Sequence, residues 1–160
     1  LGLLQDLELS VAPLPRQLIG SLRSMGQTPY DPPNVRGWVG GRSWINSATL
    51  TARRQLIQAL LQPLNEELLN GDEQIELAAA YADGVTNFTL DEAQLAQWAK
   101  LPPADRSREL IRRYVPALAG TELERQVTTF LERSARHSEA GPATRAALAT
   151  LLESPNYQLC

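Results

Sequence analysis

The chain has 160 residues, of which 43% are hydrophobic and 21% charged. This length and balance are typical of one globular domain with a real core, and they exclude a disordered or fibrous chain. The formal net charge of -3 gives no electrostatic reason to expect nucleic acid as a partner. No apolar run approaches the roughly 18 residues of a membrane span.

The counts of metal-binding residues are equally restrictive. Cys160, the last residue, is the one cysteine, and His137 is the one histidine. We therefore expect no disulfide, no zinc, haem or iron–sulfur site, and no cofactor. The chain begins with Leu1 and its one methionine is Met25. We therefore expect a fragment or a processed product of a longer chain.

The first half of the sequence predicts helices on either side of one long irregular loop. We expect residues 1–12 to be an extended or frayed lead-in, followed by a helix over residues 15–25 that Gly26 ends. The next stretch, GQTPYDPPNVRGWVGGRSWIN at 26–46, is too rich in proline and glycine for a regular helix. A second helix is predicted from Ser47, with Asn46 or Ser47 as its cap, to about Pro63 or Asn70, with Asn70-Gly71 as its stop. A shorter helix over residues 73–82 follows.

The second half predicts a run of helices with clear start signals. The pairs Thr89–Glu92 and Thr121–Glu124 match capping boxes, and the first should open a helix to about Lys100. Pro102-Pro103 should end it, and apolar spacing over residues 110–118 predicts another helix. The last helix is predicted to open at Pro142 and to end at residues 154–155, leaving an irregular tail. Residues 85–88 are a weak strand candidate.

These elements predict an all-α fold. We expect a single domain over residues 1–160, a compact bundle of about six to seven short helices. Its one long Trp/Gly/Pro-rich loop is expected to lie between the first two helices.

That loop and the start of the following helix hold the candidate binding residues. Trp38 and Trp44 supply flat amphipathic rings that could stack on a sugar, a peptide or a partner helix. They could equally fill the gap between helices and core. The full candidate set is Tyr30, Asp31, Asn34, Trp38, Trp44, Arg53 and Arg54. No residue is put forward as catalytic.

Arg54 shares a helical stripe with the apolar residues of the second helix, and Arg53 lies beside that stripe. At least one guanidinium should therefore sit near the apolar face. Such a group needs an acceptor, and Asp31 or loop carbonyls are the nearest candidates. The arginine could bind an anion in a cleft. It could instead act as a latch that holds the Pro-rich loop to the helix.

The segment LRSMGQTPYDPPNVRGWVGGRSWINSATLTARRQ resembles the hallmark of a large bacterial protein family, domain-of-unknown-function family 1800. The ending LLESPNYQL at 151–159 is similar to the closing motif of that family. The positions that carry the hallmark are Gly26, Gln27, Tyr30, Asp31, Pro32, Pro33, Gly37, Trp38, Trp44 and Arg53. The resemblance implies that this chain is the C-terminal part of a longer, exported protein in the periplasm or outside the cell. It implies no particular activity.

Two functional hypotheses follow. The first is a non-catalytic helical module for binding or assembly, whose partner is the missing N-terminal region or another protein. The alternative is part of an extracytoplasmic enzyme that acts on a glycan or another polymer, with residues 28–54 lining the site.

Overall fold

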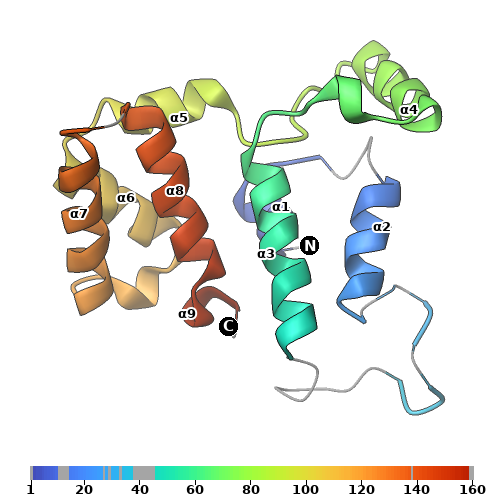
Figure 1. The fold of residues 1–160 in the computed structure, drawn as a ribbon, viewed down its shortest axis with the longest axis horizontal. Helices are drawn as coiled ribbons and strands as arrows, with labels where there is room; N and C mark the ends of the chain where they lie inside the picture. The colour runs from blue at the N-terminus through green and yellow to red at the C-terminus, as the bar shows by residue number, and fades with distance from the viewer. Residues whose placement is uncertain are drawn as a thin grey trace. The chain divides into compact units, whose positions relative to one another are not determined.

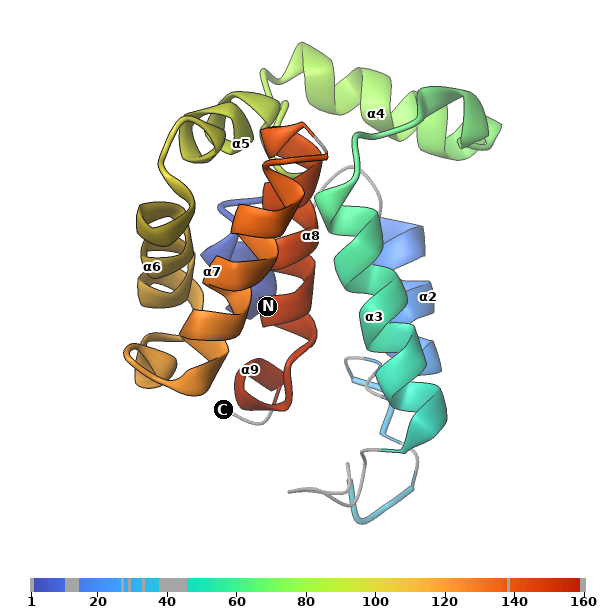
Figure 2. The ribbon, with the colours of Figure 1, turned by 60° about the vertical axis from the view of Figure 1, so that its left-hand side comes forward.

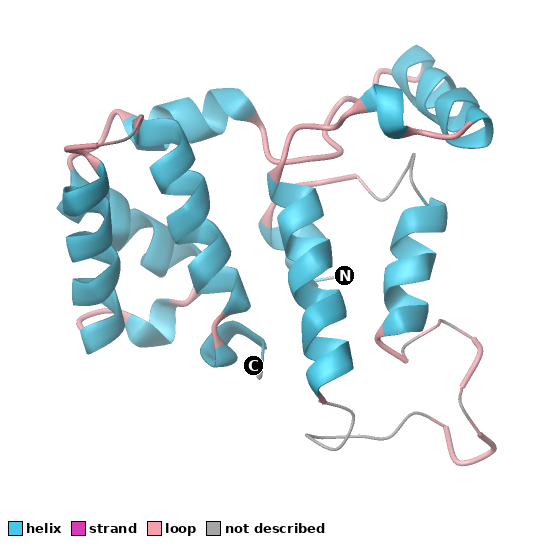
Figure 3. Ribbon diagram, viewed as in Figure 1, coloured by secondary structure: helices cyan, strands magenta, loops and turns pink. Residues whose placement is uncertain are grey.

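The computed structural model of the chain describes residues 2–10, 15–26, 28, 30–32, 34–37, 46–137 and 139–158. These residues form nine α-helices and two short 3₁₀-helices, and they contain no strand (Figures 1 and 3). The all-α prediction is therefore confirmed, and the weak strand candidate at 85–88 is wrong. The described residues have more helices than the expected six or seven, and two of the extra ones are short helices near the two ends of the chain.

The contacts divide the chain into two compact units, residues 1–89 and residues 90–160. The single-domain organisation over residues 1–160 stays a prediction.

The first unit begins with helix α1 (Gly2–Asp6) and helix α2 (Pro15–Ser24). The expectation of an extended or frayed lead-in over residues 1–12 is wrong for residues 2–6, which form α1; Leu4 within this helix and Leu7 just after it are buried. Residues 1, 11 and 12 lie outside the described residues. Helix α2 agrees with the sequence prediction and packs along α3 (Ser47–Leu61) (Figure 2).

The rest of the first unit contains the 3₁₀-helix η1 (Glu66–Leu68) and helix α4 (Gly71–Ala82). We expected Asn70 to end the preceding helix. It instead caps α4, in a reciprocal capping box with Glu73. Beneath α4 lies a small apolar cluster, against which Leu64 and Val85 also pack; its buried members are Leu69, Leu77, Ala80 and Phe88.

The second unit is a helix bundle around α8 (Ala140–Glu153), which contacts each of the four other α-helices of this unit. Those helices are α5 (Glu92–Ala99), α6 (Pro103–Tyr114), α7 (Glu122–Ser134) and the short α9 (Pro155–Gln158). A second 3₁₀-helix, η2 (Pro116–Leu118), connects α6 to α7. Most buried residues of α8 are alanine and leucine, which favour the helical conformation.

The core of this bundle consists of aliphatic side chains with one aromatic pair. Trp98 and Tyr114 meet edge to face with ring centroids 6.2 Å apart, a favoured aromatic geometry. The largest described side chains of this unit with essentially no exposure are Leu110, Ile111, Leu131, Leu148, Leu151, Leu152, Thr144 and Ser107. As predicted, the inward face of the last long helix includes residues 147, 148, 151 and 152.

Three helix starts in this unit differ from the sequence prediction. Asp91, not Thr89, caps α5, because its carboxylate accepts the backbone N–H of Ala93 at 2.9 Å. Pro103 does not merely break a helix but occupies the first position of α6, where a missing N–H costs nothing. The last long helix opens at Ala140, two residues before the predicted Pro142.

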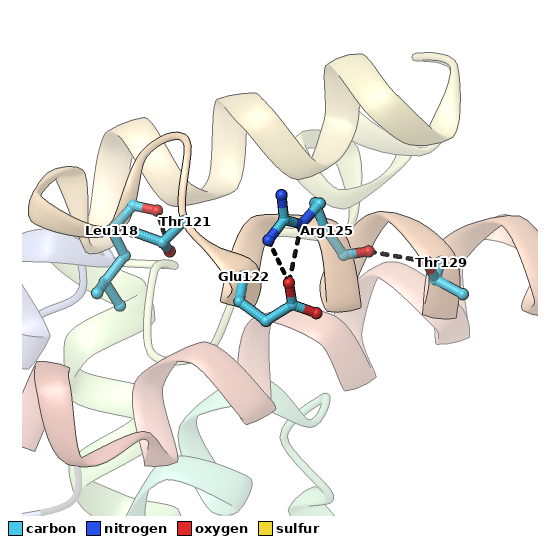
Figure 4. A network of polar contacts seen from close by, with 5 residues as sticks. All are labelled: Leu118, Thr121, Glu122, Arg125 and Thr129. Carbon is cyan, nitrogen blue, oxygen red and sulfur yellow. Dashed lines mark hydrogen bonds and ion pairs between the residues drawn. The ribbon is translucent and has the colours of Figure 1, made fainter.

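The first turns of α7 contain a small network of polar contacts (Figure 4). Thr121 is the N-cap residue as predicted, but its hydroxyl accepts no backbone N–H of the helix and donates to the carbonyl of Leu118 at 2.6 Å. Arg125 donates from Nε to Glu122 at 2.8 Å, and the Thr129 hydroxyl donates to the Arg125 carbonyl at 2.8 Å. The Arg125–Glu122 pair is exposed, so it contributes little to stability.

Candidate functional site

Part of the predicted binding loop is a series of tight turns, which we call the turn segment (residues 28–37 where described). The backbone N–H of Asp31 donates to the Thr28 carbonyl at 3.3 Å. The side-chain oxygen of Asn34 accepts the Arg36 N–H at 2.9 Å. The backbone carbonyl of Asn34 accepts the Gly37 N–H at 2.9 Å. Gly37 has φ of 85°, a conformation that glycine adopts without strain. Short-range hydrogen bonds therefore define these turns.

The turn segment presents its large side chains to solvent. Tyr30 is 99% exposed and Val35 is 105% exposed, relative to a standard reference state. Tyr30 also has a φ of 61°, which costs an aromatic residue roughly 1–2 kcal/mol. Among the described residues, the ring packs against nothing that would offset this strain. A strained, fully exposed aromatic residue is typical of a surface that contacts a partner.

The carboxylate of Asp31 and the side chain of Asn34 are also exposed. Trp38 and Trp44, the two tryptophans of the candidate set, lie outside the described residues. The turn segment thus brings Tyr30, Asp31 and Asn34 together on one short stretch of solvent-exposed chain.

The far end of the candidate segment is the N-terminus of α3, which has a complete cap. Asn46 accepts the Thr49 N–H at 3.0 Å, and the Thr49 hydroxyl accepts the Asn46 N–H at 2.9 Å. Of the two predicted caps, Asn46 is the one used. This reciprocal pair fixes where α3 begins, and with it the positions of the two arginines that follow.

Arg53 and Arg54 differ in burial. Arg53 is half-buried, and this burial lowers the pKa of its guanidinium from the usual value. Arg54 is exposed. Arg53 precedes the buried Ile57 by one helical turn. The expectation that at least one guanidinium sits near the apolar face stays a prediction. Asp31 is exposed. A latch between Arg53 and Asp31 would therefore not bury the carboxylate of Asp31.

Sequence reasoning missed the most heavily bonded side chain of the second unit, Arg106 on α6. Its side chain is 5% exposed. Nε donates to the Trp98 carbonyl at 3.0 Å, and Nη2 donates to the carbonyls of Ala99 and Leu101 at 2.6 and 2.8 Å. These three acceptors lie at the C-terminal end of α5, where free carbonyls carry partial negative charge.

The same guanidinium reaches the N-terminal turn of α8. Nη1 donates to the Thr144 hydroxyl at 3.1 Å and to the Ala140 carbonyl at 3.4 Å. Burial lowers the pKa of Arg106, and the group stays a cation because arginine does not deprotonate in proteins. Every donor is used, so the arrangement joins α5, α6 and α8 and leaves no donor for a ligand.

A family model described as "Protein of unknown function (DUF1800)" matches residues 3–159, nearly the whole chain. The chain belongs to this family. No curated protein and no solved structure matches it.

The membership confirms the resemblance read from the Gly-Gln, Pro-Pro and tryptophan positions of the loop. In this DUF1800 chain, the described residues contain no group of three or more His, Cys, Asp and Glu side chains placed to hold a metal ion. Within the same residues, no helix is both long and apolar enough to cross a membrane.

Proposed function

We propose that the chain is a non-catalytic binding or assembly module of a larger, exported bacterial protein, and that residues 28–54 are its contact surface. The observation that carries this proposal is the fully exposed Tyr30, held in a strained conformation by a turn. A side chain that costs backbone strain and gains no packing is explained if it packs against a partner. The partner is another protein or another part of the same longer protein.

The composition of residues 28–54 supports binding over catalysis. Asp31 is the one carboxylate of this stretch, which contains no histidine, cysteine or lysine. Glycan hydrolysis ordinarily needs two carboxyl groups that face each other across the substrate. The exposed Asp31 has no second carboxylate within the segment, so the enzyme alternative would require residues from elsewhere.

Site-specific photocrosslinking tests the proposal. Tyr30 is replaced by a photoreactive phenylalanine analogue in cells that naturally produce the protein, and the adducts are identified by mass spectrometry. We expect a discrete protein adduct from position 30. The matched control is the same replacement at Ile75, which is 70% exposed but lies on α4.

The proposal fails if position 30 gives no discrete adduct under conditions where the protein is folded. It also fails if positions 30 and 75 give the same non-specific mixture. A carbohydrate adduct at position 30 would favour the glycan alternative over a protein partner.

A further inference from the structure

The outer side of α4 is apolar and exposed. Leu77 and Ala80 are buried on the inner side of this helix, in the small apolar cluster, whereas Ile75 on the opposite side is 70% exposed. Three exposed alanines follow Ile75 at helical spacing. We call this surface the α4 patch, which consists of Ile75, Ala78, Ala79 and Ala82. A helix that is apolar on both sides is normally buried on both sides, so the patch is typical of a contact surface.

The 3₁₀-helix η1 widens this apolar surface. The Tyr81 hydroxyl donates to a glutamate carboxylate of η1 at 2.8 Å, and Gln74 Nε2 donates to the Leu69 carbonyl at 3.0 Å. These two hydrogen bonds hold the η1 segment along one side of α4, so Leu68, which is 80% exposed, borders the patch. The Tyr81 ring is not part of the patch, because it lies against Phe88 with ring centroids 5.8 Å apart. The surface therefore offers two large aliphatic side chains together with small alanines.

Carboxylates border the α4 patch, and this part of the sequence contains no cationic side chain. Residues 55–89 include six acidic residues and no lysine, arginine or histidine. Three of the six share a helical row with Ala79, at one edge of the patch; they are Asp72, Glu76 and Asp83. Asp72 and Asp83 are exposed, and Glu76 is half-buried. The surface is therefore apolar in its middle and negatively charged at its edge.

We propose that the α4 patch binds a basic amphipathic helix of another protein. In this complex, apolar side chains of the partner helix pack on Ile75 and Leu68, and its lysines or arginines pair with the carboxylates at the edge. The small alanines let the axes of the two helices approach closely.

Negatively charged partners are disfavoured at the α4 patch. An anionic lipid surface, or the same patch of a second copy, would place negative charge against the carboxylates at the edge. The patch is separate from residues 28–54, so this inference goes beyond the proposed function and does not depend on it. In the crosslinking experiment above, position 75 therefore lies on a different contact surface, and its adducts should differ from those at position 30.

A synthetic basic peptide tests the proposal with the full 160-residue chain. The probe is a fluorescein-labelled peptide of about 18 leucine, alanine and lysine residues, with its leucines at helical spacing on one face. We expect saturable binding in fluorescence anisotropy at about 0.15 M salt, with a Kd in the micromolar range. Two matched peptides should not bind: in one, every lysine is replaced by glutamate, and in the other, every leucine is replaced by serine.

Substitutions in the chain locate the binding surface. Ile75→Ser should raise the Kd for the basic peptide about tenfold, because it removes a large aliphatic side chain from the contact. Its control, Val35→Ser, removes an exposed aliphatic side chain outside the patch and should change the Kd by less than about twofold. Asp83→Lys should raise the Kd about fivefold. Its control, Glu132→Lys, makes the same change in net charge near the end of α7 and should change the Kd by less than about twofold.

Circular dichroism melts establish that all four variants are folded. The proposal is overturned if the basic peptide does not bind, if the glutamate peptide binds equally well, or if each variant binds like its control. Self-association of the chain in sedimentation velocity that Ile75→Ser abolishes would overturn it in favour of a second copy. Cosedimentation with phosphatidylglycerol vesicles that the same substitution abolishes would overturn it in favour of a membrane surface.

Discussion

Arg106 offers the sharpest test of what holds the second unit together. Arg106→Ala removes every donor to the carbonyls of Ala99 and Leu101, for which the structure shows no other donor. Both acceptors are partly buried, and such an acceptor left without its partner costs about 1 kcal/mol. Two such acceptors, and two lost methylenes at about 0.8 kcal/mol each, give a loss of about 3–4 kcal/mol in the free energy of unfolding.

A second substitution separates the two contributions. Arg106→Met keeps the apolar stem and removes the donors, so it should cost only about 2 kcal/mol. The control is Arg108→Ala on the same helix, whose side chain is exposed and paired with Asp105. This control should cost less than about 0.5 kcal/mol.

Urea-induced unfolding followed by circular dichroism gives all three free energies. The reasoning is refuted if Arg106→Met is neutral or stabilising. That result would mean that the desolvation of the guanidinium offsets its hydrogen bonds, so that an apolar side chain serves equally well at this position.

Three further predictions concern the first unit. Asn70→Ala removes the capping box of α4 and should cost about 1 kcal/mol of unfolding free energy in urea; no loss would contradict the capping role. Tyr30→Ser with Val35→Ser should change that free energy by less than about 0.5 kcal/mol, whereas a larger loss would favour the latch. The hydrogen bond to Glu66, then burial and the nearby negative charge, raise the pKa of Tyr81. Its contribution to stability should be complete below about pH 10 and lost as pH rises through the folded pKa. Glu66→Gln should lower that pKa in an ultraviolet difference titration, and an unchanged titration would refute the assignment.

Sequence periodicity and caps predicted most of the helices because they depend on neighbours within one turn. Helix α2 and the start of α3 at Asn46 follow from such local signals. The short α1 carries no cap signal, and its stability comes from burial of Leu4 and Leu7, which periodicity over five residues does not report. At the start of α5 two capping patterns compete, and Asp91 takes the place expected for Thr89.

The candidate site was less predictable, for physical reasons that differ from residue to residue. The exposure of Tyr30 depends on how the turns fold back, which no spacing rule encodes. The role of Arg106 depends on backbone carbonyls at two helix ends, and carbonyls occur at every residue, so the sequence does not mark them. The half-burial of Arg53, by contrast, agrees with its place beside an apolar stripe.

Hydroxyl-radical footprinting of Tyr30 most directly tests whether the turn segment is an occupied contact surface. The modification of Tyr30 is compared between the dilute purified chain and the producing cells, with Tyr81, which is 42% exposed, as the internal reference. We predict rapid modification of Tyr30 in the dilute chain and several-fold protection in cells, with Tyr81 little changed. Slow modification in the dilute chain would contradict the exposure of Tyr30. Equal modification in both settings would contradict its role as a contact surface.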